Sequence, residues 1–561
     1  MQAWIQTLNL SRCLVRFLLP LPFLLLIGGT GAAAETGHSE LDLGIARFAL
    51  ETGDNAMALR FTRNPETEQG ALVRAKALLN TGSQNEATSL LNQLIDGRYY
   101  RGEAALLKAT LTTLGGGDQD EQKSKKLQLL RLASEKGHDE IRQQALYELA
   151  ELARTDGQPE RAGQILASMD SGYWAALGYM NIAADYAKQD LNPSRSLIAL
   201  RVAMAMTDPD PDKARGKALK SELLVRAGLL AYESANYDKA IRFLEQVPLD
   251  SYHTPQGLYL HGLALSARGN QRDAMQSWHR AKKYPLAFPG VAESWLGAGR
   301  GYDLSGYLGQ AGEAYLSASS SYESERATLR ALTDLIREKG AYQAMVHSSG
   351  QAQTAWFLAD SRMLTQPRNA YLLRFMENAG AQQRVQRVRD LTAMLERMNR
   401  QGRALAVFRS VLAERLDGST KPKAALPGHF VENLKAISER IAAARETVSA
   451  GAAKPRELKQ LALTLSDLKT SAERFDDRVR SRKQRLGRLM ITVDRAEAEL
   501  NRNRERAAKV LKQANTELDQ RMLAYVERET DRMTLALEKA EQQIAHLYEY
   551  LALQTIDRSS P

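Results

Sequence analysis

The sequence predicts an all-α protein, with helical repeats over its first two thirds and a long coiled-coil helix in its last third. Three observations support this fold class. Helix-forming residues dominate the 561-residue chain, and no run of alternating β-branched residues predicts a strand. A period close to 34 residues recurs between about residues 41 and 325, which is typical of helix-turn-helix repeats.

The N-terminus has the features of a targeting segment. Two arginines precede an apolar run over residues 17–29, and three alanines follow at 32–34. We therefore expect residues 1–34 to be a signal peptide that is cleaved before Glu35. An uncleaved membrane anchor is the alternative, although the run is short and two prolines interrupt it.

Cysteine content and charge restrict the compartment and the partners. The only cysteine, Cys13, lies in the signal segment, so the mature chain would depend on an apolar core and not on disulfides. Loss of the two arginines lowers the formal net charge from +10 to +8. We expect a periplasmic protein, with membrane association left open. An exported basic chain is expected to meet anionic lipid, an envelope polymer or a protein, and no nucleic acid.

The clearest repeats are marked by Ala240, Ala274 and Ala311, each five residues after a small turn residue. Each unit predicts two helices joined by a tight reversal. A glycine of the first helix would admit a neighbouring helix, and a bulky residue of the second would fill the gap. The expected turn residues are Gly53, Gly82, Gly157, Ala235, Gly269 and Gly306. The expected repeat-packing residues are Gly228, Ala240, Gly262, Ala274, Trp278, Trp295, Gly299, Tyr302, Ala311 and Tyr315.

These positions resemble the tetratricopeptide repeat (TPR) family, in an exported bacterial form. Trp295, Gly299 and Tyr302 fit the opening W-x₂-L-G-x₂-Y, and the alanine and tyrosine that follow fit A-x₃-F. The resemblance implies a TPR-like α-solenoid, which we assign to residues 35–345. It also implies a scaffold for protein–protein interaction and assigns no catalytic residue.

Six glycines between residues 295 and 315 raise the question of a phosphate site. Gly301 and Gly306 have the spacing of a P-loop, but Tyr307 and Leu308 occupy the positions of the required Lys and Ser/Thr. The repeat pattern therefore explains this stretch better. Four of its glycines have no role in the pattern, and they predict a looser hinge: Gly297, Gly301, Gly309 and Gly312.

The last third divides into a further helical region at 346–416, a linker at 417–428 and a helical, coiled-coil domain at 429–561. A heptad frame that begins at Leu458 places apolar residues at fifteen of seventeen a and d positions through Ala514. The frame slips near residues 515–522, which predicts either a stutter or a hairpin turn. Such a coiled coil would drive oligomerisation or span a distance. The sequence is compatible with pairing within one chain and with pairing between chains.

Basic charge is concentrated in this domain. Residues 478–512 contain twelve Arg or Lys and four Asp or Glu. One interpretation is a solvated face beside the apolar seam. The other is a docking surface for anionic lipid or an envelope polymer. The residues assigned to that surface are Arg478, Arg480, Arg482, Lys483 and Arg485.

A search for chemistry yields no catalytic, cofactor-binding or metal-binding residue, and we expect neither a cofactor nor a metal. The histidines lack metal-site spacing, and no nucleophile elbow is present. The segment DPDPDK at 208–213 is interpreted as a turn with a helix N-cap and not as a calcium loop. The predicted function is a periplasmic scaffold that binds a protein or peptide in a cell-envelope assembly. The alternative is an envelope enzyme that acts on glycans through paired carboxylates.

Overall fold

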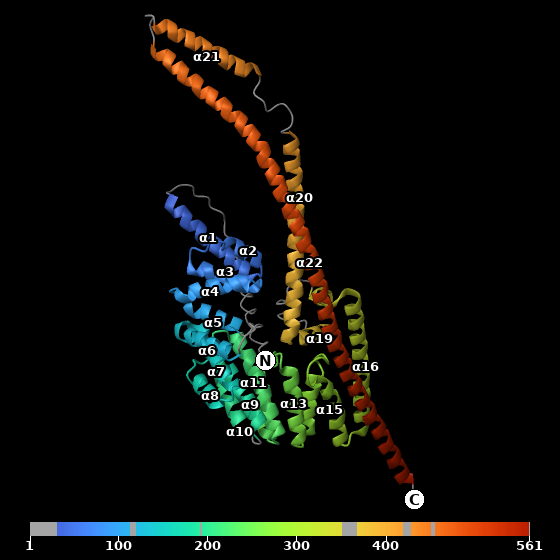
Figure 1. Ribbon diagram of the computed structural model, residues 1–561. Helices are drawn as coiled ribbons and strands as arrows, with labels where there is room; N and C mark the ends of the chain where they lie inside the picture. The colour runs from blue at the N-terminus through green and yellow to red at the C-terminus, as the bar shows by residue number, and fades with distance from the viewer. Residues whose placement is uncertain are drawn as a thin grey trace. The chain divides into compact units, whose positions relative to one another are not determined.

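The computed structural model describes residues 31–112, 119–190, 193–349, 367–418, 428–449 and 455–559. Every regular element in these ranges is an α-helix, and no strand occurs within them (Figure 1). The all-α prediction is confirmed. Of the predicted signal peptide, only residues 31–34 fall in the described ranges, where they open the first helix.

The helices vary in length from seven residues to 105. Their bounds are α1 Gly31–Glu51, α2 Asn55–Phe61, α3 Glu68–Asn80, α4 Gln84–Asp96, α5 Arg101–Thr112, α6 Gln119–Lys136, α7 Asp139–Thr155, α8 Pro159–Ala167, α9 Tyr173–Gln189, α10 Ser194–Thr207, α11 Lys213–Glu233, α12 Tyr237–Leu244, α13 Thr254–Ala267, α14 Gln271–Ala281, α15 Val291–Leu304, α16 Leu308–Lys339, α17 Ala341–Ser349, α19 Pro367–Met376, α20 Ala379–Gly418, α21 Gly428–Ser449 and α22 Pro455–Ser559.

The chain forms two compact units. The first comprises residues 1–330, 354–374 and 528–561, and the second comprises 331–353 and 375–527. Helices α16, α19 and α22 each contribute residues to both units. The predicted linker at 417–428 lies mostly outside the described residues. Helix α20 ends at Gly418 and α21 begins at Gly428.

The first unit is a TPR-like helical-repeat solenoid. From α1 to α15, each helix packs against the next helix in the chain. Odd-numbered helices also pack on one another over most of this run, which includes α5 on α7, α9 on α11 and α13 on α15. This pattern of contacts generates one layer of odd-numbered helices and a second layer of even-numbered helices, as expected for stacked helix pairs.

The turns between paired helices repeat one backbone motif. All six predicted turn residues have positive φ, from +57° at Ala235 to +90° at Gly269. In each turn, the next residue donates its N–H to the carbonyl five positions earlier, as Asn270 does to Leu265 at 2.9 Å. This bond is the mark of a Schellman C-cap, which ends a helix on a left-handed residue. The prediction of tight reversals at these positions is confirmed.

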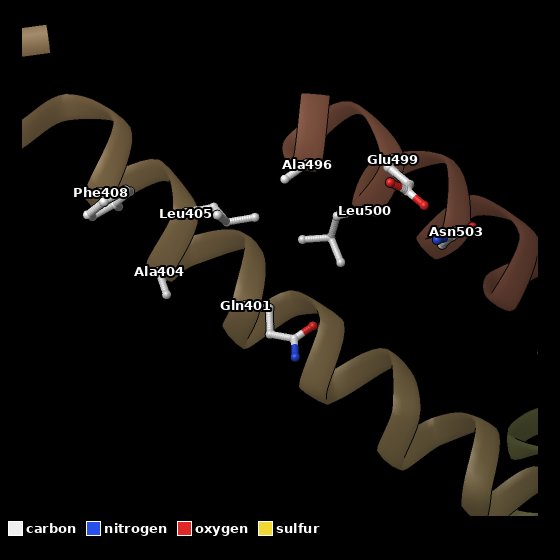
Figure 2. Close-up of a pocket in the computed structure, with 8 residues that line it drawn as sticks. All are labelled: Gln401, Ala404, Leu405, Phe408, Ala496, Glu499, Leu500 and Asn503. Atoms are coloured by element: carbon white, nitrogen blue, oxygen red, sulfur yellow. The ribbon is translucent and has the colours of Figure 1, made fainter. Parts of the chain in front are cut away.

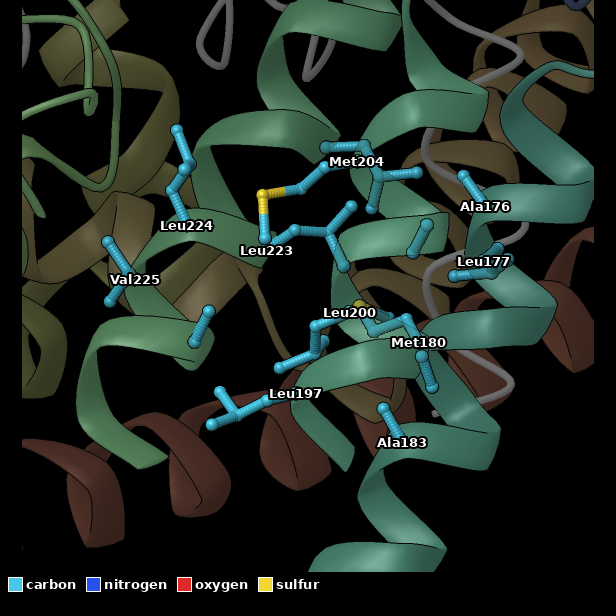
Figure 3. Close-up of a cluster of buried hydrophobic side chains, with 14 of the residues drawn as sticks. Ala176, Leu177, Met180, Ala183, Leu197, Leu200, Met204, Leu223, Leu224 and Val225 are labelled. Atoms are coloured by element: carbon cyan, nitrogen blue, oxygen red, sulfur yellow. The ribbon is translucent and has the colours of Figure 1, made fainter. Parts of the chain in front are cut away.

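The solenoid core is built largely from small and aliphatic side chains. In its central part, Leu200 of α10 and Leu223 of α11 are almost fully buried and belong to the same cluster as Ala176 of α9 (Figure 3). The same buried cluster extends along the repeats from Tyr147 to Trp278. Alanines allow neighbouring helices to approach closely, so the layer can stack without large cavities.

The C-terminal part of α22 belongs to the solenoid unit. Met533, Ala540 and Leu547 are buried at seven-residue spacing. Leu547 packs with Ala311 and Tyr315 of α16. This segment therefore covers the last repeat with its apolar stripe, as a terminal capping helix does in repeat proteins.

The second unit contains an antiparallel pair formed by α20 and α22. Gly402 lies against Leu500, and the Arg409 guanidinium pairs with Asp494 at 2.9 Å. At the start of α17, the Ala341 N–H donates to the Asp519 carboxylate at 2.6 Å. These contacts pair α22 with elements of its own chain.

Helix α22 is continuous through residues 515–522, so the slip in the heptad frame is not a hairpin turn. The buried residues Ala514, Leu518, Met522 and Val526 are spaced by four, and the seven-residue spacing resumes at Met533. Four-residue steps of this kind are typical of a stutter, which shifts the apolar stripe around an unbroken helix.

Candidate binding surfaces

The repeat-packing residues bring glycines and bulky side chains together. Ala240, Ala274 and Ala311 are fully buried. A Cβ atom at Gly228 would lie 2.5 Å from Leu244 Cδ2, and one at Gly299 would lie 2.5 Å from Tyr315 Cε1. At these positions, glycine is the residue that lets the two helices of a pair meet.

Trp278 shows the same arrangement twice. Its indole packs on Gly262 of α13, and a Cβ atom at Gly297 of α15 would lie 2.9 Å from its Cδ2. The ring is 2% exposed, and its Nε1 donates to the Tyr259 carbonyl at 3.2 Å. Trp278 is thus held between the first helices of two successive repeats.

Close contacts between helices also give packing roles to other glycines that the sequence pattern left unexplained. A Cβ atom at Gly301 would lie 2.6 Å from Met275 Cγ, and one at Gly312 would lie 3.3 Å from Leu547 Cδ2. Gly309 has no neighbour of this kind within 4 Å. Close helix approach therefore accounts for Gly297, Gly301 and Gly312, and these three glycines supply no argument for a hinge.

Trp295 and Tyr302 lie at the edge of the core. The Lys282 ammonium lies 3.9 Å from the centroid of the Trp295 ring, a cation–π contact. Burial lowers the pKa of Lys282. The Tyr302 hydroxyl lies 3.5 Å from His279 Nε2. Both aromatic residues therefore have polar neighbours on the preceding helix pair.

A buried ionic cluster connects three odd-numbered helices. The fully buried Asp210 carboxylate accepts from the Tyr173 N–H at 2.7 Å and from the Arg215 guanidinium at 3.1 Å. Arg215 also donates to Glu140 of α7 at 2.7 Å. Asp212 caps α11 by accepting from two backbone N–H groups, so the 208–213 segment is a turn and an N-cap. Sequence spacing did not reveal the cluster, because Glu140 and Arg215 are 75 residues apart.

Glu325 is a buried carboxyl group with a perturbed pKa. It is 6% exposed on α16, and burial raises its pKa, against the opposing effects of Tyr371 and Arg532. Arg532 donates to the Leu286 carbonyl at 2.7 Å and pairs with Glu529 at 2.9 Å. These groups connect α16, α19 and α22 within the first unit, so we assign Glu325 to the helix contacts and not to a substrate site.

The predicted anionic-docking residues are described in part. Arg482, Lys483 and Arg485 are exposed on α22. The side chains of Arg478 and Arg480 lie outside the description. The three exposed cations are available to a partner.

An open groove lies between α20 and α22 in the second unit, and the sequence analysis missed it. It encloses about 650 Å³. Leu405 and Leu500 point toward one another across it, and Phe408 lies one turn along α20 (Figure 2). Its remaining lining residues are Gln401, Ala404, Ala496, Glu499 and Asn503. The walls are mainly apolar, as in grooves that accept an amphipathic helix.

Within the described ranges, no group of three or more His, Cys, Asp or Glu side chains is placed to hold a metal ion. No helix in the described part of the chain is both long and apolar enough to cross a membrane.

No family model matches this chain, and no curated protein matches it. Solved structures to which it is similar include a tetratricopeptide repeat protein from Parabacteroides merdae ATCC 43184, at 15% identity, with 44% of this chain and 93% of that chain covered and a TM-score of 0.26. Another is the TPR domain of P58(IPK), at 14% identity, 50% and 92% coverage and a TM-score of 0.17. A third is the Cut9–Hcn1 hetero-tetramer of the APC/C, at 12% identity, 85% and 96% coverage and a TM-score of 0.20.

The TPR-like character of the chain is visible in its own turns and helix contacts. Six helix-ending turns share one backbone motif, and glycine meets a bulky side chain at corresponding places in successive repeats. Repeat solenoids of this kind present extended surfaces to protein partners.

Proposed function

We propose that this protein is a periplasmic scaffold whose repeat solenoid binds a protein or peptide partner in a cell-envelope assembly. The observation that carries the proposal is the stack of helix pairs from α1 to α15, in which each helix packs on its neighbours. A stack of this kind offers a long, rigid surface on which a partner can be bound at several repeats.

Export is the second part of the proposal, and the N-terminal signal features support it. Osmotic-shock fractionation should release the protein with periplasmic markers. Mass spectrometry of the released protein should find Glu35 as its first residue. Recovery of the uncleaved chain with the cytoplasmic fraction would contradict the assignment.

The binding role is tested by photo-crosslinking in the cells that make the protein. A photoreactive amino acid is placed at exposed solenoid positions, Tyr99 and Ile198, which are 70% and 59% exposed. We expect a discrete adduct with one envelope protein. A matched position outside the solenoid is Ile491, which is 62% exposed on α22. Absence of adducts, or the same adducts from Ile491, would contradict solenoid binding.

Self-association through α22 extends the proposal. Leu468 belongs to the predicted heptad seam and is 46% exposed. Exposed seam residues are the type of surface that a second coiled-coil strand buries. Sedimentation of the full chain should show a dimer or higher oligomer, and Leu468→Glu should shift it to the monomer. A monomeric parent would exclude this role.

Docking on an anionic surface is proposed for the basic residues of α22. Replacement of Arg478, Arg480, Arg482, Lys483 and Arg485 by glutamine should reduce cosedimentation with phosphatidylglycerol vesicles, because each loses about 1 kcal/mol of attraction near such a surface. The parent's binding should also weaken as salt is raised. Salt-insensitive binding that the substitutions leave unchanged would refute this role.

A further inference from the structure

The groove lies in the middle of the α20–α22 pair, and the two helices pack closely beyond each of its ends. Toward one end of the groove, Leu412 of α20 and Val493 of α22 are 5% and 6% exposed. Toward the other end, Val388 and Ala507 are 1% and 7% exposed. Between them, Phe408 is 49% exposed although it lines the groove. The apolar surface of this middle section therefore remains uncovered by the chain's own helices as described.

The apolar face continues by one heptad beyond the groove in both directions. Residues seven apart lie on the same face of a helix in a coiled coil. The residues that lie seven positions from a lining residue, on the side away from the groove, are Met394, Val411, Leu489 and Val510. They are 39%, 38%, 46% and 38% exposed. On α20, this face runs from residue 394 to residue 411, which is about 25 Å at 1.5 Å per residue. That length suits a partner helix of about 17 residues.

Arginines border the groove on both helices. Residues three or four apart are neighbours on a helix surface. By that spacing, Arg400 adjoins the lining residue Ala404, while Arg502 and Arg506 adjoin Glu499 and Asn503. All three arginines are exposed, and none has an ion pair among the described residues. By contrast, the nearby acids Asp494 and Glu497 are already paired with Arg409.

We propose that this groove binds an acidic amphipathic helix of another protein. The occupant places apolar side chains at i, i+3 or i+4, and i+7 against Leu405, Phe408 and Leu500. Its carboxylates face the bordering arginines. A second copy of the α20–α22 pair is disfavoured as the occupant, because it would bring like charges together at the groove. The inference rests on the proposed function in treating the chain as a binding protein, and it specifies a site and a partner chemistry outside the solenoid.

The test uses the full-length protein and a fluorescein-labelled probe. The probe is a 21-residue amphipathic peptide with leucine at heptad a and d positions and mainly glutamate elsewhere. A second peptide replaces every glutamate with lysine, and a third scrambles the acidic sequence so that no apolar face forms. Fluorescence anisotropy should show binding of the acidic peptide at least tenfold tighter than binding of either control. Absence of binding by the acidic peptide, or equal binding of the scrambled one, would overturn the proposal.

Matched variants locate the binding. Phe408→Ala should weaken the acidic peptide fivefold or more, whereas Ile491→Ala removes a similarly exposed side chain that does not line the groove and should have no effect. Arg502→Gln with Arg506→Gln should weaken binding and reduce its salt dependence. Arg482→Gln with Lys483→Gln removes the same charge elsewhere on α22 and should leave binding unchanged. Circular dichroism confirms that each variant is folded.

A membrane is the competing occupant, and the same variants separate the two. If Phe408→Ala weakens binding to phosphatidylglycerol vesicles but leaves the acidic peptide unaffected, the groove is a lipid contact and the proposal fails. Photo-crosslinks from Tyr99 and Ile198 report on the solenoid, which is a different unit of the chain. If the parent protein gives these solenoid adducts but does not bind the acidic peptide, the groove proposal fails and the proposed function stands.

Discussion

Substitution of Gly262 by alanine tests the contact that joins two successive repeats. A methyl group at this position would overlap the indole of Trp278. The indole is 2% exposed and has little room to retreat, because Gly297 also lies against the ring. Gly262→Ala should therefore destabilise the solenoid, although alanine is the better helix former.

The magnitude follows from two opposing effects. Overpacking of a well-filled core costs about 1–3 kcal/mol, and the confined ring places this site near the upper limit. Replacement of a glycine inside a helix by alanine regains about 1 kcal/mol. The net loss is about 2 kcal/mol, which corresponds to roughly a 30-fold increase in the population of the locally open state.

Hydrogen–deuterium exchange of peptides that cover residues 254–304 measures this local opening. Gly163→Ala is the matched control, since Gly163 also lies inside a solenoid helix but has no atom within 4 Å of the added methyl group. It should leave exchange unchanged or slow it in its own helix. Equal exchange in the Gly262→Ala variant and the parent would refute the packing argument.

Three further perturbations test separate parts of the account. Ala235→Gly should raise the free energy of unfolding by about 1 kcal/mol, because Ala235 has φ of +57°. Gly269→Ala should lower it, because Gly269 has φ of +90°. Urea titrations that give the same sign for both changes would contradict this. Burial raises the pKa of Glu325 above its ordinary value of 4.5, so the folded state binds the proton more tightly than the unfolded state does. The free energy of unfolding should therefore decline as pH rises from 4.5 through the raised pKa. Urea titrations should show that Glu325→Gln flattens this decline, and an unchanged pH dependence would contradict the assignment of the effect to Glu325. Leu547→Ala should lower the free energy of unfolding by about 2–5 kcal/mol and speed hydrogen–deuterium exchange at the start of α16. Leu553→Ala, at a 57% exposed position of the same helix, should change both quantities little. Equal effects of the two substitutions would show that α22 does not cap the solenoid.

The repeats were predictable from sequence because their determinants are local. A turn residue that must adopt positive φ and an alanine five positions later both recur with the period of the fold. Gly262 and Trp278, on adjacent helices, are 16 residues apart, so one repeat unit contains both partners of the contact. The heptad seam of α22 is likewise visible within a single helix.

The contacts that sequence reasoning missed join distant segments. Arg532 donates to the Leu286 carbonyl across 246 residues, and Leu547 packs beside Tyr315. An apolar stripe reveals that a helix face is buried but does not reveal what covers it. The groove was missed for the same reason, since it exists only where α20 and α22 run side by side. The second role of Trp278 depends on Gly297 of the next repeat, and the repeat pattern gave that glycine no role.

The central claim is that the intact solenoid is the surface that binds the partner. The most direct measurement is the yield of the photo-crosslinked adduct from Ile198 in cells, compared among the parent, Gly262→Ala and Gly163→Ala at equal protein levels. Gly262→Ala should lower the yield, because opening of the α13–α15 repeats shortens the ordered surface, whereas Gly163→Ala should preserve it. An equal yield from all three proteins, or no adduct from the parent, would contradict the claim.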